Sequence, residues 1–161
     1  MRRFFDTNVL VYARDASDRA KQQRARTLVS EAMADDDFIV STQVLMEFYA
    51  TCMRRRLLGA PQALALVHLW SGYDTVAHTP DLIVRALELH QAHSMSPWDA
   101  LIVQAALDAR CEVLFTEDLQ HGRRLGTLEI VNPFLGTTHE PAARYGRTPA
   151  KARATRRAAR A

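Results

Sequence analysis

The chain opens with the stretch Arg3-Phe4-Phe5-Asp6-Thr7-Asn8. Residues 2–5 predict a short buried strand, and the polar residues that follow predict a turn or the start of a helix. Asp6 therefore stands at the carboxyl end of the first strand. An aspartate in that position is commonly a turn former or a helix cap, so its role depends on what the rest of the chain brings to the same place.

A second stretch of the same design is Val113-Leu114-Phe115-Thr116-Glu117-Asp118. Residues 112–115 predict a strong strand, and Asp118 follows it. Asp118 has the alternative role of a turn residue. Thr116 and Asp118 can point the same way from an extended strand end, whereas Glu117 would point elsewhere and ranks below Asp118 as a ligand.

Between and beyond these stretches, short strands alternate with helices. Further strands are predicted at residues 38–40, 75–78 and 128–131, and helices at about 17–33, 42–58, 61–72, 80–93 and 96–110. This alternation predicts an α/β fold with about five short parallel strands and helices on both faces of the sheet. Ligands of such sheets bind outside the carboxyl ends of the strands, where Asp6 and Asp118 are expected.

Two more acids lie on predicted helices. Glu47 shares its stripe with Gln43, Thr51 and Arg54, so it reads as an ordinary solvated glutamate unless that stripe faces a cleft. Asp99 follows the cap predicted at Ser96, and the helix dipole alone favours an acid there by ~0.3–1 kcal/mol. Its helical neighbours are apolar, which places its side chain at the rim of the core and favours a cleft-facing acid.

If the fold gathers Asp6, Glu47, Asp99 and Asp118, their charges repel one another. Two carboxylates about 4 Å apart repel by roughly 4 kcal/mol at a near-surface effective dielectric. A hard divalent cation with oxygen ligands relieves that repulsion, and Mg²⁺ or Mn²⁺ fits best. The chemistry expected of such a site is metal-assisted hydrolysis of a phosphodiester.

Other site chemistries lack their signatures. No Gly-x-Gly occurs, which removes the dinucleotide-binding and P-loop fingerprints. The six histidines do not form a zinc pattern. Enzymes that phosphorylate an aspartate need a lysine beside the acids, and neither Lys21 nor Lys151 is predicted at a strand carboxyl end.

Charge divides the chain into two parts. Residues 139–161 hold seven Arg or Lys and one Glu, whereas the whole chain carries only +3, so residues 1–138 are mildly acidic. The basic segment contains no large aliphatic residue and cannot extend a core. We expect one domain over residues 1–138 and a basic Ala/Arg-rich tail that either meets an anionic polymer or is simply solvated.

The rest of the composition points to the cytoplasm. Only two cysteines, Cys52 and Cys111, are present, and both lie in apolar, helix-like surroundings that favour reduced thiols. No signal peptide is expected, because Asp6 interrupts the apolar stretch after Arg2 and Arg3. No run of about 18 apolar residues predicts a membrane span.

Taken in order, these motifs resemble the PIN-domain ribonucleases, and specifically the toxins of VapBC-type toxin–antitoxin pairs. The matching segments are residues 5–10, 41–49, 96–102 and 116–118. The resemblance implies a PIN-like three-layer sandwich, a homodimer, an RNA substrate and a cognate antitoxin. It implies Mg²⁺ or Mn²⁺ held by Asp6, Asp99 and Asp118 with help from Glu47, and support from Asn8 and Thr116. The tail lies outside the family's common core.

Two further expectations follow. An antitoxin would place an arginine against the acids and would use exposed apolar residues of helix 44–58 as its groove. The alternative function is a non-catalytic RNA- or protein-binding module on a PIN-like body. The presence of all four acids argues against that alternative, because an inert site has no reason to keep a repulsive cluster.

Overall fold

The computed structural model describes residues 1–136. Its strands are β1 (Arg3–Phe5), β2 (Phe38–Ser41), β3 (Asp74–Val76), β4 (Val113–Phe115), β5 (Arg124–Leu125) and β6 (Leu128–Val131). Its helices are α1 (Thr7–Tyr12), α2 (Arg19–Ala34), α3 (Thr42–Arg55), α4 (Ala60–Trp70), α5 (Pro80–His93) and α6 (Pro97–Asp108). The predicted boundary at residue 138 and the basic tail lie outside the described residues.

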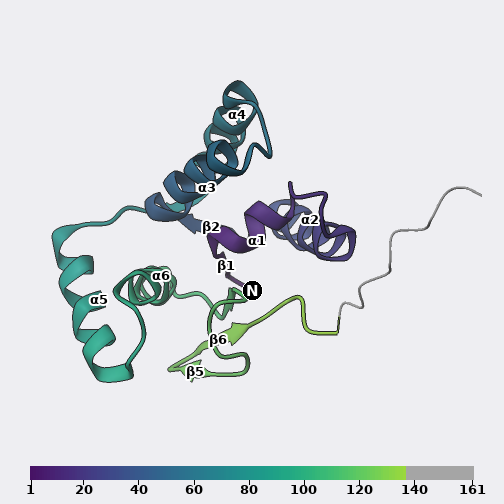
Figure 1. Cartoon of the computed structure of the whole chain (residues 1–161). Coiled ribbons are helices and arrows are strands. Elements are labelled where there is room, and N and C mark those ends of the chain that lie inside the picture. The colour runs from purple at the N-terminus through teal and green to yellow at the C-terminus, as the bar shows by residue number, and fades with distance from the viewer. Residues whose placement is uncertain (137–161) are drawn as a thin grey trace, which may run out of the picture.

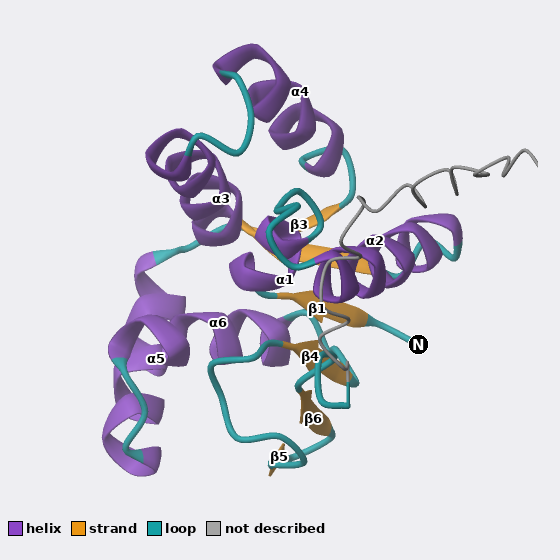
Figure 2. Ribbon diagram, turned by 45° about the vertical axis from the view of Figure 1, so that its right-hand side comes forward, coloured by secondary structure: helices purple, strands orange, loops and turns teal. Residues whose placement is uncertain are grey.

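The strands form one sheet in the order β3-β2-β1-β4-β6-β5, in which every pairing except β5 with β6 is parallel. Figure 1 shows α5 and α6 on one side of this sheet, α1 and α2 on the other, and α3 with α4 projecting as an arm. The ribbon in Figure 2, turned by 45°, shows the same grouping of helices around the strands. The predicted α/β fold with a mostly parallel sheet is confirmed.

The order of the strands decides where a site can form. The chain moves from β1 outward to β2 and β3, and then returns to place β4 on the other side of β1. The order in which the chain adds strands therefore reverses between β1 and β4. Open α/β sheets bind ligands at such a reversal. Phe5 pairs with Phe115, and the backbone N–H of Asp6 donates to the Phe115 carbonyl at 3.0 Å. The carboxyl ends of the two central strands are thus held side by side.

Apolar strand residues build the core beneath this edge. Phe4, Phe5, Ile39 and Leu114 are each at most 1% exposed, and the Phe5 ring packs 5.1 Å from that of Phe38. Full burial of such a side chain contributes about 1.5–3 kcal/mol. The core thereby fixes the strands whose ends carry Asp6 and Asp118.

Helix starts follow the predicted capping chemistry more closely than helix ends do. The hydroxyls of Ser41, Thr79 and Ser96 each accept a backbone N–H at the start of α3, α5 and α6. The prediction that α3 continues to Leu58 is wrong, because Arg56 adopts a left-handed conformation (φ 55°) and ends the helix at Arg55. Gly59 instead precedes the first residue of α4.

The structure adds one strand that the sequence did not predict. β5 is two residues long and runs antiparallel to β6, with Gly126 at φ 61° in the connecting turn. A two-residue strand has too few side chains to show an alternating pattern. It closes the edge of the sheet and lies away from the acids.

Two further findings concern the cysteines and the helices. Both cysteines are buried and free, and burial raises the pKa of the Cys111 thiol to about 12. In residues 1–136, no helix combines the length and the apolar character that crossing a membrane requires.

Candidate active site

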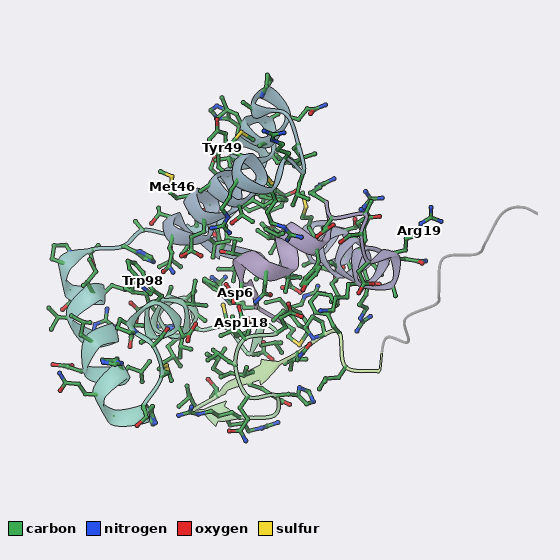
Figure 3. The ribbon with its side chains drawn as sticks, in the orientation of Figure 1. Asp6, Arg19, Met46, Tyr49, Trp98 and Asp118 are labelled. Atoms are coloured by element: carbon green, nitrogen blue, oxygen red, sulfur yellow. The ribbon has the colours of Figure 1, made fainter. Side chains whose placement is uncertain are left out.

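All four predicted acids line one pocket of about 350 Å³ at the carboxyl edge of the sheet. Asp6 follows β1, Glu47 comes from α3, Asp99 from the first turn of α6, and Asp118 follows β4. Figure 3 shows Asp6 and Asp118 next to each other near the middle of the molecule, with Trp98 to their left at the start of α6. Four segments that are far apart in the sequence thus meet at one concave surface.

Asp6 is the most buried of these acids, with 8% of its surface exposed. One carboxylate oxygen accepts the N–H of Thr7 at 2.6 Å and caps α1, while the other accepts the Thr116 hydroxyl at 2.7 Å. Burial raises the pKa of Asp6 to about 6 against the lowering effect of these hydrogen bonds, and the charges of Asp118 and Glu47 add to the rise. The site therefore disfavours the charged form of Asp6, chiefly because the carboxylate is buried.

Asn8 joins the two strand ends. Its side-chain amide donates to Asp6 at 3.1 Å, to the Thr116 hydroxyl at 3.1 Å and to Asp118 at 2.9 Å. The backbone N–H of Asp118 also donates to Thr116 at 3.1 Å. Asn8 and Thr116 therefore occupy the supporting positions that the resemblance implied, and they hold Asp6 and Asp118 around one nitrogen atom.

The stripe of α3 that carries Glu47 faces the pocket, together with Gln43, Thr51, Arg54 and Arg55. Glu47 accepts the Thr7 hydroxyl at 2.9 Å through one oxygen and the Gln43 amide at 2.9 Å through the other. Sequence reasoning did not single out Thr7 as a partner of Glu47. The contact joins α1 to α3 across 40 residues, so no local sequence signal marks it.

Asp99 is partly exposed and held by its own helix cap. The Ser96 hydroxyl accepts the backbone N–H of Asp99 at 3.0 Å and donates to its carboxylate at 2.7 Å. This contact holds the side chain at the start of α6, where Asp99 lines the same pocket as Asp6 and Asp118.

Glu117 lines the same pocket as Asp118, and its carboxylate belongs to a cluster that the sequence did not reveal. Its carboxylate accepts the Tyr12 hydroxyl at 2.5 Å and the Lys21 ammonium at 2.6 Å. The Lys21 nitrogen lies 4.3 Å from the centre of the Tyr12 ring. Lys21 lies on α2 and not at a strand end, as predicted. Its long side chain nevertheless reaches Glu117, the residue beside Asp118.

This cluster gives a testable consequence for stability. Replacing Lys21 with methionine leaves Glu117 without its cation next to an acidic pocket, and should lower the free energy of unfolding by about 1–3 kcal/mol. Urea denaturation measures the change. Lys21→Arg should keep most of the stability. Adding Glu117→Gln to Lys21→Met should recover part of the lost stability. If the double variant instead loses the sum of what the two single variants lose, the two side chains do not interact.

The donors in the pocket suit a hard cation, because they are carboxylates and carboxamides. Among the described residues, the buried Oδ1 of Asn8 has no hydrogen-bond partner. In the geometry described for residues 1–136, however, no three His, Cys, Asp or Glu side chains are arranged to hold an ion. The carboxylates are engaged by Thr7, Asn8, Ser96 and Thr116, so the donor set fits a divalent metal in chemistry, and binding would require some of these hydrogen bonds to be exchanged.

The fold and the site define an α/β protein with an acidic pocket at the switch point of a parallel sheet. The chain belongs to the PIN domain family, whose model matches residues 3–124. That range contains all four acids with Asn8 and Thr116. Comparison with curated protein sequences gives no match.

Several solved structures share the fold. The Mycobacterium tuberculosis VapC20, a Sarcin-Ricin loop cleaving toxin, superposes with a TM-score of 0.58 at 23% identity, covering 72% of this chain and 91% of its own. A toxin–antitoxin complex from Klebsiella pneumoniae gives 0.57 at 20% identity, covering 81% and 96%. VapBC2 from Rickettsia felis, bound to a DNA fragment from its promoter, gives 0.56 at 17% identity, covering 81% and 97%. At these identities the likeness establishes the fold.

Proposed function

We propose that this protein is a Mg²⁺- or Mn²⁺-dependent endoribonuclease and the toxin of a VapBC-type toxin–antitoxin pair. The observation that carries the proposal is the meeting of four acids from four separate segments in one pocket of a PIN fold. The family resemblance supplies the substrate class. The structural neighbours that are toxins or toxin–antitoxin complexes support the biological role.

Each side chain takes a role that its position supports. Asp6, Asp99 and Asp118 would hold the ion with help from Glu47. When bound, the ion supplies Lewis-acid stabilisation of the charge that develops on the phosphate. Asn8 and Thr116 keep Asp6 and Asp118 in place through the hydrogen bonds given above. Glu47 lines the pocket and only assists in holding the ion, so we assign it the role of accepting a proton from an attacking water.

Part of the segment 44–58 is available to an antitoxin. Val44, Leu45, Phe48 and Cys52 of α3 are buried in the core. The apolar residues that stay at least partly exposed are Met46 (70%), Tyr49, Met53, Leu57 and Leu58. We propose that an antitoxin uses this exposed set as its groove and reaches the pocket, where the acids would attract an arginine, and that the protein acts as a homodimer in the cytoplasm.

Purified protein incubated with RNA and Mg²⁺ should produce new RNA ends that chelation of the metal abolishes. Expression of the protein alone should arrest bacterial growth, and expression of the Asp99→Asn variant should not. Sequencing the RNA ends identifies the cleaved bond. Binding of RNA without cleavage at any Mg²⁺ or Mn²⁺ concentration would favour the non-catalytic module instead.

A further inference from the structure

The acidic pocket has an aromatic side chain at one rim. Trp98 is 67% exposed and lines the pocket directly before Asp99. The second tryptophan, Trp70, is 1% exposed and packs 4.7 Å from the Phe48 ring. Within residues 1–136, no aromatic ring stacks on the Trp98 indole. Trp98 therefore presents an open aromatic face beside the acids, a position in which it adds nothing to the core.

A second exposed side chain, of opposite chemistry to the acids, lines the same pocket. Arg54 lies on α3 two turns beyond Glu47, about 11 Å along the helix axis. Its neighbour Arg55 forms an ion pair with the buried Asp15. The side chain of Arg54 makes no ion pair or hydrogen bond with any of the residues that the structure describes. Its guanidinium is thus available to an anion.

We propose that Trp98 and Arg54 are substrate-binding residues of the pocket that holds the acids. Trp98 stacks on the base next to the phosphate held at the acids, and Arg54 pairs with a phosphate farther along the strand. The inference rests on the proposed function and adds which side chains bind the RNA. Stacking on an exposed indole requires a base that is free of its own neighbours, so the site takes unpaired RNA and is tolerant of base identity.

The two tryptophans make the test direct. In the Asp118→Asn variant, which we expect to bind RNA without cutting it, a short unstructured RNA in Mg²⁺ should quench the fluorescence of Trp98, because Trp70 is shielded. Adding Trp98→Ala should weaken binding roughly 5- to 150-fold, and Trp98→Phe should keep most of the affinity while removing the quench. An RNA with abasic positions should bind the Asp118→Asn protein more weakly than intact RNA does. The protein that also carries Trp98→Ala should bind the two RNAs with nearly equal affinity.

Arg54 has a different signature. Arg54→Gln should make the log–log dependence of affinity on salt shallower by about 0.7, as expected for one lost phosphate contact on a single strand. Trp98→Ala should leave that slope unchanged. Two exposed residues outside the pocket serve as matched controls: Met46→Ala for the tryptophan and Arg19→Gln for the arginine, both labelled in Figure 3. Neither control should change RNA affinity by more than about twofold.

The outcomes distinguish a failure of the proposed ribonuclease function from a failure of the RNA-binding roles given to Trp98 and Arg54. If the unsubstituted protein neither binds nor cleaves RNA, the proposed function fails. If it cleaves RNA but Trp98→Ala and Arg54→Gln behave like their controls, the function stands and the inference is overturned. Trp98 would then be a protein contact, and an antitoxin segment that quenches its fluorescence would show this.

Discussion

Asp99→Asn should reduce Mg²⁺-dependent RNA cleavage by more than 100-fold while the protein remains folded. The substitution removes one charge from a pocket that also holds Asp6 and Asp118, and it leaves the backbone N–H that Ser96 caps. Loss of a group that only orients a metal ligand typically costs about 10- to 100-fold, so loss of a ligand should cost more. Initial rates on one RNA across a Mg²⁺ series measure the effect.

The matched control is Asp81→Asn, which changes an acid in the first turn of α5 outside the pocket. It should lose about as much helix-dipole stabilisation as Asp99→Asn, ~0.3–1 kcal/mol, and keep full activity. Ser96→Ala tests the support of Asp99, since it removes both contacts of that hydroxyl. It should lower activity by about 10- to 100-fold and lose about 1 kcal/mol of stability. Full activity of Asp99→Asn at saturating Mg²⁺ would remove Asp99 from the site.

The positions of Asp6 and Asp118 were accessible from the sequence because strand ends are marked by short apolar runs. The carboxyl ends of neighbouring parallel strands must lie at the same edge of a sheet. Ser96-Pro97 located Asp99 for a similar reason, since both residues favour the start of a helix. In each case the signal is local in the chain, and the topology of the fold supplies the rest.

The contacts that complete the pocket carry no local signal. Tyr12, Lys21 and Glu117 meet because three segments pack together, and Lys21 is 96 residues from Glu117. The end of α3 was missed for another reason: Arg56 takes a left-handed conformation that sequence patterns assign to glycine. Thr7 and Glu47 form a hydrogen bond across 40 residues. Such partners depend on tertiary packing, which spacing alone does not encode.

Asp6→Asn should stabilise the protein relative to the wild type in the absence of divalent metal, and more so at pH 7 than at pH 4. The folded-state pKa of Asp6 is raised from 3.8 to about 6. The folded protein therefore holds a proton that the unfolded chain releases in this window, and the wild type loses stability as pH rises through it. The gain from asparagine should be larger at pH 7 than at pH 4 by about 2–2.5 kcal/mol, since each pKa unit corresponds to about 1.4 kcal/mol and part of the effect is already present at pH 4.

Urea unfolding of both proteins in a chelator at several pH values between 3 and 7 measures this difference. Asp15→Asn is the control of opposite sign, because hydrogen bonds from Ser17 and the charge of Arg55 hold the pKa of Asp15 below its ordinary value. That variant should be less stable than the wild type at pH 7, and the deficit should shrink as pH falls below about 4. A gain for Asp6→Asn that does not change with pH would mean that Asp6 is not strained by its charge.

Mg²⁺ should reverse the ranking of the two proteins at pH 7. An ion that binds the clustered carboxylates of the folded state stabilises the wild type by an amount that grows with the logarithm of its concentration. Asp6→Asn lacks the buried carboxylate whose pKa is raised, so the stability of this variant should respond far less to Mg²⁺. The same titration at pH 4 should show little response in either protein, because protons then compete for the carboxylates. Equal responses of wild type and variant at pH 7 would show that the ion binds away from Asp6. The metal-dependent chemistry proposed for the pocket would then be contradicted as well.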